Sequence, residues 1–309
     1  MDARDVAAGE TINLNRQGLA KPRWMSELLI GTSGWSYSEW TGVFYPNSST
    51  NKLSFYSKVF RTAEIDSTFY AFPSKGLVLG WSRYSPEGFV FSAKLPRAMT
   101  HEKRLDLGQA VESDLVRFLS LMKPLITTGK LGPVLIQLPP SYSYEEDFGK
   151  LKSFLEAVPD DVRFAVEFRH PSWLRDEVWS LLRSRNVANV IVDEPLLPPE
   201  TVVTADFAFI RWHGRGTRPW YNYRYTEAEL TTWVPKVKEV TSKVNRTFGY
   251  FNNHFRGFAV ENSLKMMGML GVSTPEQDEV GAKASRFLEG GGRREGEGSI
   301  LEYVDRKGV

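Results

Sequence analysis

The sequence predicts a single (β/α)8 TIM-type barrel, an α/β fold in which helices surround a parallel β-sheet. Short β-branched or aromatic runs alternate with longer amphipathic stretches along the middle of the chain. Most of these runs are almost continuously apolar, which is typical of strands buried on both faces of a parallel sheet. Eight such runs fit a barrel better than an open doubly wound sheet.

The expected strands follow one another along the chain at 28–32, 62–66, 89–94, 134–138, 163–168, 189–193, 207–212 and 248–252. Apolar residues repeat at helical spacing between most of them, at 53–60, 116–122, 148–155, 178–182 and 261–270. Thr226, with Glu229 three residues on, has the pattern of a capping box that begins a helix. Residues 194–206 contain three prolines, through which a helix cannot run, so we expect an irregular crossover after the sixth strand.

The domain boundaries follow from the two ends of the chain. Residues 1–27 are polar and lack periodicity, and Met25 stands directly before the first strand, so we expect a disordered or misannotated N-terminal extension. Residues 28–275 form the predicted barrel domain. Residues 276–309 include a Gly-rich stretch and are expected to be a flexible C-terminal tail.

Composition excludes several classes of function. The 309 residues contain no cysteine, which excludes a disulfide scaffold, a thiolate nucleophile, a Cys-ligated zinc site and an iron–sulfur cluster. Lys plus Arg number 39 against 37 Asp plus Glu, a balance that argues against a generally basic nucleic-acid coat. No apolar run approaches the roughly 20 residues that span a bilayer, and the N-terminal segment does not resemble a secretory signal, so we expect no membrane association and a cytoplasmic location.

Polar side chains follow every predicted strand at its carboxyl end. Ligands of parallel α/β folds bind beyond these ends, so their convergence predicts a binding or active site. The candidate residues, in chain order, are Ser33, Trp35, Asp66, Tyr70, Lys94, Gln137, Glu167, Arg169, His170, Asp193, Arg211, His213, Asn252, Asn253 and His254.

Asp66 and Glu167 are the best-placed carboxylates for acid–base catalysis. Glu167 lies between apolar residues and must be paired or functional, because an unpaired buried carboxylate is costly. Lys94, Arg169 and Arg211 could form a cationic crown that binds phosphate, or could neutralise the carboxylates and leave a site suited to sugars.

The four histidines of the chain, His101, His170, His213 and His254, lie at or just after predicted strand ends. Histidines and carboxylates from separate strands can hold a divalent metal in barrel hydrolases. The chain has neither a His-x-His pair on the first strand nor a His-Glu-x-x-His helix. We therefore assign no metal ligands and leave a divalent metal as an alternative; no other cofactor is indicated.

The chain resembles the YecE-like family, domain of unknown function family 72. The motifs that carry the resemblance are Ile30-Gly31-Thr32-Ser33-Gly34-Trp35, Ile65-Asp66-Ser67-Thr68-Phe69-Tyr70, Lys94-Leu95-Pro96 with Thr100-His101, Gln137-Leu138-Pro139-Pro140, Glu167-Phe168-Arg169-His170-Pro171-Ser172-Trp173, Arg211-Trp212-His213-Gly214 and Phe251-Asn252-Asn253-His254. The resemblance covers about Leu28 to Val272 and implies a TIM-type barrel. It also implies nucleic-acid or phosphate-ester chemistry, by similarity to zinc-dependent apurinic-site endonuclease barrels. The dense ligand set of those enzymes is absent from this sequence.

Three functions follow as hypotheses. The first is an enzyme acting on a phosphate-bearing or nucleotide-like substrate, with Glu167 as base, Asp66 or His254 as second proton carrier, His213 as a further catalytic candidate, and the three cations as an anion clamp. The second is a glycosidase-like hydrolase that uses Asp66 and Glu167 at a separation of roughly 5–10 Å. The third is a non-catalytic nucleic-acid or ligand-binding barrel, whose binding would weaken steeply with salt. The sequence does not fix the oligomeric state.

Overall fold

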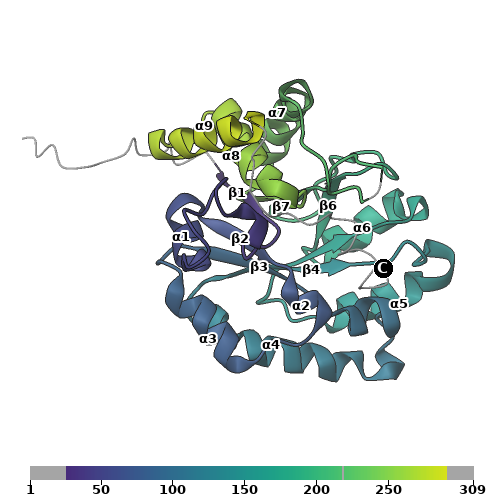
Figure 1. Ribbon diagram of the computed structural model, residues 1–309. Helices are drawn as coiled ribbons and strands as arrows, with labels where there is room; N and C mark the ends of the chain where they lie inside the picture. Colours follow the sequence, from purple (N-terminus) through teal and green to yellow (C-terminus); the bar gives the residue numbers. More distant parts are fainter. Residues whose placement is uncertain (1–25, 218, 291–309) are drawn as a thin grey trace, which may run out of the picture.

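The structure is a computed structural model that describes residues 26–217 and 219–290. Within these residues, eight parallel strands form one sheet that curls into a barrel surrounded by helices (Figure 1). The strands are β1 (Glu27–Thr32), β2 (Thr62–Ile65), β3 (Val90–Lys94), β4 (Leu131–Gln137), β5 (Phe164–Glu167), β6 (Ala188–Asp193), β7 (Phe207–Trp212) and β8 (Arg246–Phe251). The predicted (β/α)8 TIM-type barrel and all eight predicted strands are therefore confirmed.

The strand order is β1-β8-β7-β6-β5-β4-β3-β2, so the barrel has one seam, between β1 and β2. A single bridge between Ser33 and Glu64 joins the two strands at their carboxyl ends. Lower in the seam, the Tyr56 hydroxyl accepts a hydrogen bond from the Thr32 amide and donates one to the Thr62 carbonyl, each at 3.0 Å. Tyr56 thus replaces a direct strand-to-strand hydrogen bond at the seam.

The helices lie outside the sheet; most of them connect successive strands, and the last two follow β8. They are α1 (Lys52–Val59), α2 (Ser67–Tyr70), α3 (Lys75–Tyr84), α4 (Val111–Thr127), α5 (Tyr144–Ala157), α6 (Asp176–Ser184), α7 (Glu227–Ser242), α8 (Phe258–Leu270) and α9 (Pro275–Glu289). Thr226 and Glu229 form the predicted capping box at the start of α7. Residues 194–206, all described, contain no helix, which confirms the irregular crossover between β6 and β7.

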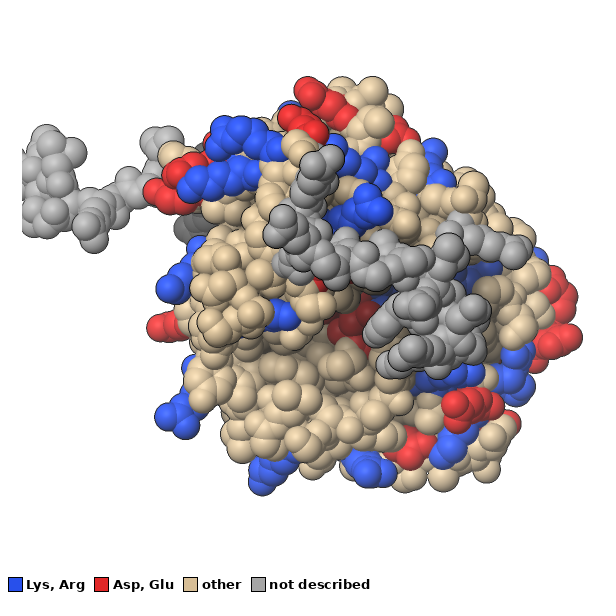
Figure 2. Space-filling model, viewed as in Figure 1, with Lys and Arg blue, Asp and Glu red and all other residues tan. Residues whose placement is uncertain are grey.

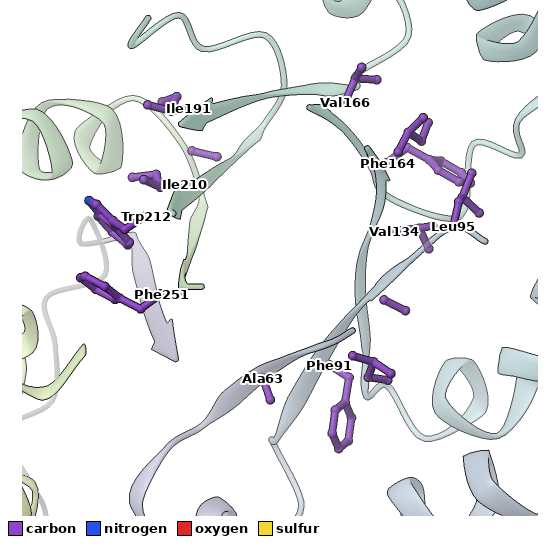
Figure 3. Close-up of a cluster of buried hydrophobic side chains, with 14 of the residues drawn as sticks. Ala63, Phe91, Leu95, Val134, Phe164, Val166, Ile191, Ile210, Trp212 and Phe251 are labelled. Carbon is purple, nitrogen blue, oxygen red and sulfur yellow. The ribbon is translucent and has the colours of Figure 1, made fainter. Parts of the chain in front are cut away.

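Side chains alternate along each strand between the helices and the barrel interior. Figure 3 shows the outward set, which includes Phe91, Val166 and Ile210 and points away from the barrel centre into the layer beneath the helices. The inward set is apolar toward the amino ends of the strands, where Leu29, Val90, Phe207 and Phe248 belong to a separate interior cluster. Because both faces are buried, the strands read as continuous apolar runs in the sequence.

The expected flexible tail from residue 276 is wrong for residues 276–289, which form α9. The helix begins with a capping box between Thr274 and Gln277, and the Gln277 side-chain amide donates to the Val59 carbonyl at 2.6 Å. On the other side of α9, the Ser285 hydroxyl donates to buried Glu261 of α8 at 2.7 Å. These contacts tie α9 to both α1 and α8, so it belongs to the folded barrel domain.

The remaining predictions for the ends lie mostly outside the described residues. Residues 1–25 and 291–309 are not described, so the disordered or misannotated N-terminal extension and the end of the flexible tail stay predictions. The extension does not reach residue 27 as expected, because β1 begins at Glu27 and the Ser26 hydroxyl donates to the Thr241 carbonyl at 2.6 Å.

Candidate functional site

Charged side chains fill the barrel interior at the carboxyl ends of the strands. Glu64 of β2, Lys94 of β3, Glu167 of β5 and Arg211 of β7 share the inward phase of their strands, and each is at most 6% exposed. Parallel strands deliver these residues to one end of the barrel, where ligands bind in this fold. The predicted convergence of polar strand ends is therefore observed for this group.

Arg211 lies at the centre of the group and is fully buried. Its Nη2 atom is 2.6 Å from Glu64 Oε1 and 3.2 Å from Ser33 Oγ, and its Nη1 atom is 2.6 Å from Glu167 Oε2. Ser33 Oγ in turn donates to Glu64 Oε1 at 2.6 Å. One guanidinium thus joins the ends of β1, β2, β5 and β7.

A second guanidinium extends the network above Glu167. Arg169 Nε donates to Glu167 Oε1 at 2.6 Å, and its Nη2 atom lies 3.2 Å from His213 Nε2. His213 Nδ1 is 3.0 Å from the Asn252 amide nitrogen. Asn252 therefore orients the His213 ring, and the predicted site residues Glu167, Arg169, His213 and Asn252 are brought together.

Glu194, directly after β6, completes the network. Its side chain has no exposed surface, and Oε2 lies 2.8 Å from Arg169 Nη1. Neither carboxylate oxygen has a hydrogen bond of good geometry among the described residues. Burial raises the pKa of Glu194 to about 7, against the opposing effect of Arg169. Glu194 is thus a carboxyl group whose protonation changes near neutral pH.

A more accessible layer lies above this buried network. Asp66 forms an ion pair with Lys94, and the Asp66 side chain is 26% exposed. Lys94 Nζ also lies 3.7 Å from Glu64 Oε1 and 5.7 Å from the centre of the Phe69 ring. Lys94 therefore connects the accessible Asp66 to the buried Glu64.

An aromatic stack stands beside Asp66. The His254 ring lies between Tyr37 and Tyr221, with ring-centre distances of 4.5 and 5.2 Å and angles of 9° and 22°. The Trp40 indole donates to the His254 carbonyl at 2.7 Å and fixes the backbone at this point. This stack forms an aromatic wall of the site. Figure 2 shows acidic atoms in a recess near the centre of one face, with basic side chains gathered above it.

The electrostatics of the site divide its residues into two groups. Burial alone would raise the pKa of Glu167, but Arg169, Arg211 and His213 hold it well below its usual range. The pKa of Asp66 is also lowered, because the effect of Lys94 outweighs that of burial. Burial lowers the pKa of His213 to about 3 and also lowers that of His254. At neutral pH, both carboxylates are therefore ionised and both imidazoles neutral.

Several predicted site residues lie away from the barrel axis. Asp193 has the outward phase of β6 and accepts a hydrogen bond at 3.1 Å from the Trp233 indole of α7, while also pairing with Arg215 at 2.9 Å. Asn253 is buried and donates to the Tyr223 carbonyl at 2.8 Å. Both residues fix the loop between β7 and α7 instead of lining the site.

The other predicted residues occupy the edges of the site. His170 Nδ1 faces the Ser172 hydroxyl at 2.7 Å and caps a helical turn. Trp35 packs edge-on against Trp81 of α3 at 6.3 Å. Gln137 ends β4 opposite Glu167 and is half-buried, whereas Tyr70 is 77% exposed at the end of α2.

Glu64, Glu194, Tyr37 and Tyr221 are site residues that the list of candidates predicted from strand ends does not contain. A signal was available for Glu64, because it precedes Asp66 by two residues and shares its side of the strand. Glu194 follows Asp193 directly, and one of two adjacent acidic residues at a strand end must point inward. Tyr37 follows the Gly-rich exit of the first strand, where an aromatic side chain can form a stacking wall, but its stacking on His254 together with Tyr221 depends on separate loops meeting.

A metal centre finds no support in the described part of the chain. No group of three or more His, Asp or Glu residues there is arranged to hold a metal ion. The carboxylates of the network are occupied by guanidinium groups instead. No helix among the described residues is long and apolar enough to cross a membrane.

The fold and the site define the class of protein: a TIM-type barrel with a charged and aromatic site at the carboxyl ends of its strands. Residues 29–285 match the model of the family described as "Protein of unknown function DUF72", and the chain belongs to this family.

Similar proteins agree with this assignment. The chain is 26% identical over 270 residues to the UPF0759 protein YunF of Bacillus subtilis, covering 79% of this chain and 95% of that protein. It is 27% identical over 212 residues to the UPF0759 protein YecE of Escherichia coli K12, covering 60% of this chain and 74% of that protein. A crystal structure of a DUF72 family protein from Thermotoga maritima is 34% identical, with a TM-score of 0.71, covering 79% of this chain and 99% of that one.

Proposed function

We propose that the protein is an enzyme that performs acid–base chemistry at the carboxyl end of the barrel on an uncharged, hydroxylated ring compound, a carbohydrate or a nucleoside. The observation that supports this most directly is the ion pair of Asp66 and Lys94 beside the stacked ring of His254. Here an anion, a cation and a neutral imidazole meet at the accessible end of an otherwise buried polar network.

His254 is proposed as the general base. Its lowered pKa keeps the imidazole neutral at physiological pH, and a neutral imidazole can accept a proton. Asp66 stays ionised beside Lys94 and would accept hydrogen bonds from substrate hydroxyl groups. The Lys94 ammonium would stabilise negative charge that develops on the substrate.

Glu167 is proposed as a positioning residue instead of the base. Its side chain has no exposed surface, and two guanidinium groups hold its pKa well below the usual range. A carboxylate of this kind is a poor proton acceptor near neutral pH. For the same reason, a glycosidase mechanism that needs both Asp66 and Glu167 in contact with substrate has weaker support.

The charge balance of the site favours an uncharged substrate. Each of Lys94, Arg169 and Arg211 is paired with at least one carboxylate, so the predicted cationic crown does not present an unneutralised clamp for phosphate. Aromatic rings with hydroxyl groups nearby are the surfaces on which sugar rings and nucleobases stack.

The test is a turnover panel of p-nitrophenyl glycosides, nucleosides and p-nitrophenyl phosphate. We expect turnover within the first two groups, and a loss of about 100-fold or more for the variants Asp66→Asn and His254→Asn. Asp160→Asn is the matched control, because Asp160 is 88% exposed and precedes β5 at the opposite end of the barrel. Turnover of the phosphate ester alone, or salt-sensitive DNA binding with no turnover, would favour the earlier hypotheses instead.

The pH profile tests the assignment of the base. Activity should rise as pH increases through the lowered pKa of His254, which places the acid limb below about 6.5. The charge of Asp66 raises the His254 pKa, so residual activity of Asp66→Asn should have its acid limb at lower pH. An acid limb that does not move in Asp66→Asn would contradict the assignment.

A further inference from the structure

A cavity of about 420 Å³ lies beside the site, between the loop after β1 and helices α1 and α3. Building on the proposed function, we propose that this cavity binds an uncharged planar aromatic group of the substrate, whose polar part contacts Asp66 and Lys94. The volume lies in the range of small-molecule sites, which are about 300–1,000 Å³.

The face of α3 that lines the cavity is shaped by two glycines. Gly76 and Gly80 lie one helical turn apart, and a Cβ atom added at either position would have no heavy atom within 4 Å. Leu77 and Tyr84 on the same face are 47% and 53% exposed, so large apolar side chains border the cavity. The helix thus presents apolar side chains around a space that two missing side chains leave open.

The opposite wall suits a flat ring. Trp35 and Trp81 meet edge-on, with ring centres 6.3 Å apart and an angle of 85°, so their ring planes form a corner. Ser36 and Ser67 supply hydroxyl groups at the rim, and no charged side chain is among the described residues that line the cavity. Aromatic groups pack well against such surfaces, whereas an ion would lose its hydration without a partner.

Two segments of chain run from the cavity to the site. Ser67 lines the cavity and directly follows Asp66. Trp35 lines it as well, two residues after Ser33, which is bonded to Glu64 and Arg211. A single molecule could therefore place a polar ring against Asp66 and an aromatic substituent against the corner that the two tryptophans form. Aromatic glycosides and nucleosides both consist of a polar sugar ring joined to an aromatic group.

The test measures binding of 2-naphthol, an uncharged bicyclic aromatic compound, by isothermal titration calorimetry to the full chain. We expect a dissociation constant below about 1 mM. Gly80→Leu should weaken binding at least tenfold, because its side chain occupies the cavity. Gly149→Leu is the matched control, because Gly149 lies in α5 with the same open space around its Cβ position and does not line the cavity.

Two outcomes would overturn the inference: no binding to the wild-type protein at millimolar 2-naphthol, or equal binding by Gly80→Leu and Gly149→Leu variants that give the same circular dichroism spectrum. Should Gly80→Leu not fold, Ser67→Leu at the cavity rim replaces it with the same expectation. The result is separable from the proposed function. Asp66→Asn should retain 2-naphthol binding, so loss of turnover and loss of aromatic binding are observed independently.

Discussion

Replacing Arg211 by Met removes the charge that holds the buried network together. The guanidinium is fully buried and lies 2.6 Å from both Glu64 and Glu167. Removing one member of a buried ion pair typically costs about 3–5 kcal/mol, because the remaining charge stays buried without compensation. In the variant, Glu167 still pairs with Arg169, and Glu64 still lies 3.7 Å from the Lys94 ammonium. We therefore expect the free energy of unfolding to fall by about 4 kcal/mol, the cost of one broken pair and not of two.

The stability that Arg211→Met loses relative to the wild-type protein should decrease as pH falls. In the wild-type protein the pKa of Glu167 is lowered, so its contribution to stability is present above the unfolded pKa and disappears as pH falls through the folded pKa. In Arg211→Met the Glu167 carboxylate has less compensation, so its pKa rises, and its protonation relieves the variant as pH falls. The difference in stability should therefore be largest near pH 7 and shrink toward pH 4.

The assay is urea denaturation at several pH values, with unfolding monitored by tryptophan fluorescence. Arg61→Met is the control, because the Arg61 side chain is 62% exposed in its pair with Glu27 and should contribute less than about 1 kcal/mol. A loss below about 1 kcal/mol for Arg211→Met at pH 7, or a loss that is constant between pH 4 and 7, would refute this reasoning.

Two further predictions concern stability. Tyr56→Phe leaves the buried Thr32 amide and Thr62 carbonyl without their hydrogen-bond partner at the seam. The free energy of unfolding, measured by urea denaturation, should therefore fall by about 2–4 kcal/mol. A loss below about 0.5 kcal/mol would show that the seam does not need the hydroxyl. The pKa of Glu194, raised to about 7, means that the folded state binds this proton more tightly than the unfolded state, so Glu194 contributes a slope by which stability falls as pH rises from about 4.5 to 7, opposite in sign to the contributions of His213 and His254, whose pKa values are lowered. Glu194→Gln should remove this slope, worth up to about 3 kcal/mol, and an unchanged pH dependence of the thermal midpoint would contradict the assignment.

The fold was predictable because burial on both sheet faces leaves a direct trace in the sequence. Each strand of the barrel contacts apolar groups on both faces, so its sequence is a continuous apolar run. This run is present whichever strands lie beside it in the sheet. The α9 helix left a weaker trace: its sequence is mostly polar, and only a few residues such as Gln277 and Ala284 are buried. Its position next to a Gly-rich stretch made it resemble part of the tail.

The positions of the site residues were predictable, but their partners were not. The end of a strand can be located from its apolar run, which identified Asp66, Lys94, Glu167 and Arg211. Which of these ends meet depends on how the barrel closes and on the stagger of its strands, and no local pattern encodes that. The phase of Asp193 was misjudged for a related reason, since a shift of one residue moves a side chain to the other face.

The buried network of charged residues ends at Asp66, its accessible member, and helps to hold that residue in place. Buried ion pairs are weak contributors to stability compared with apolar groups of the same volume, so a barrel needs none of these charges in order to fold. The network does fix four strand ends, because Arg211 of β7 binds Ser33 directly after β1, Glu64 of β2 and Glu167 of β5. Glu64 also faces Lys94, and Lys94 holds Asp66 at the accessible end. A displacement of Arg211 would therefore reach Asp66 through three charged contacts, by way of Glu64 and Lys94, and we expect Arg211→Met to lower turnover even where the variant remains folded.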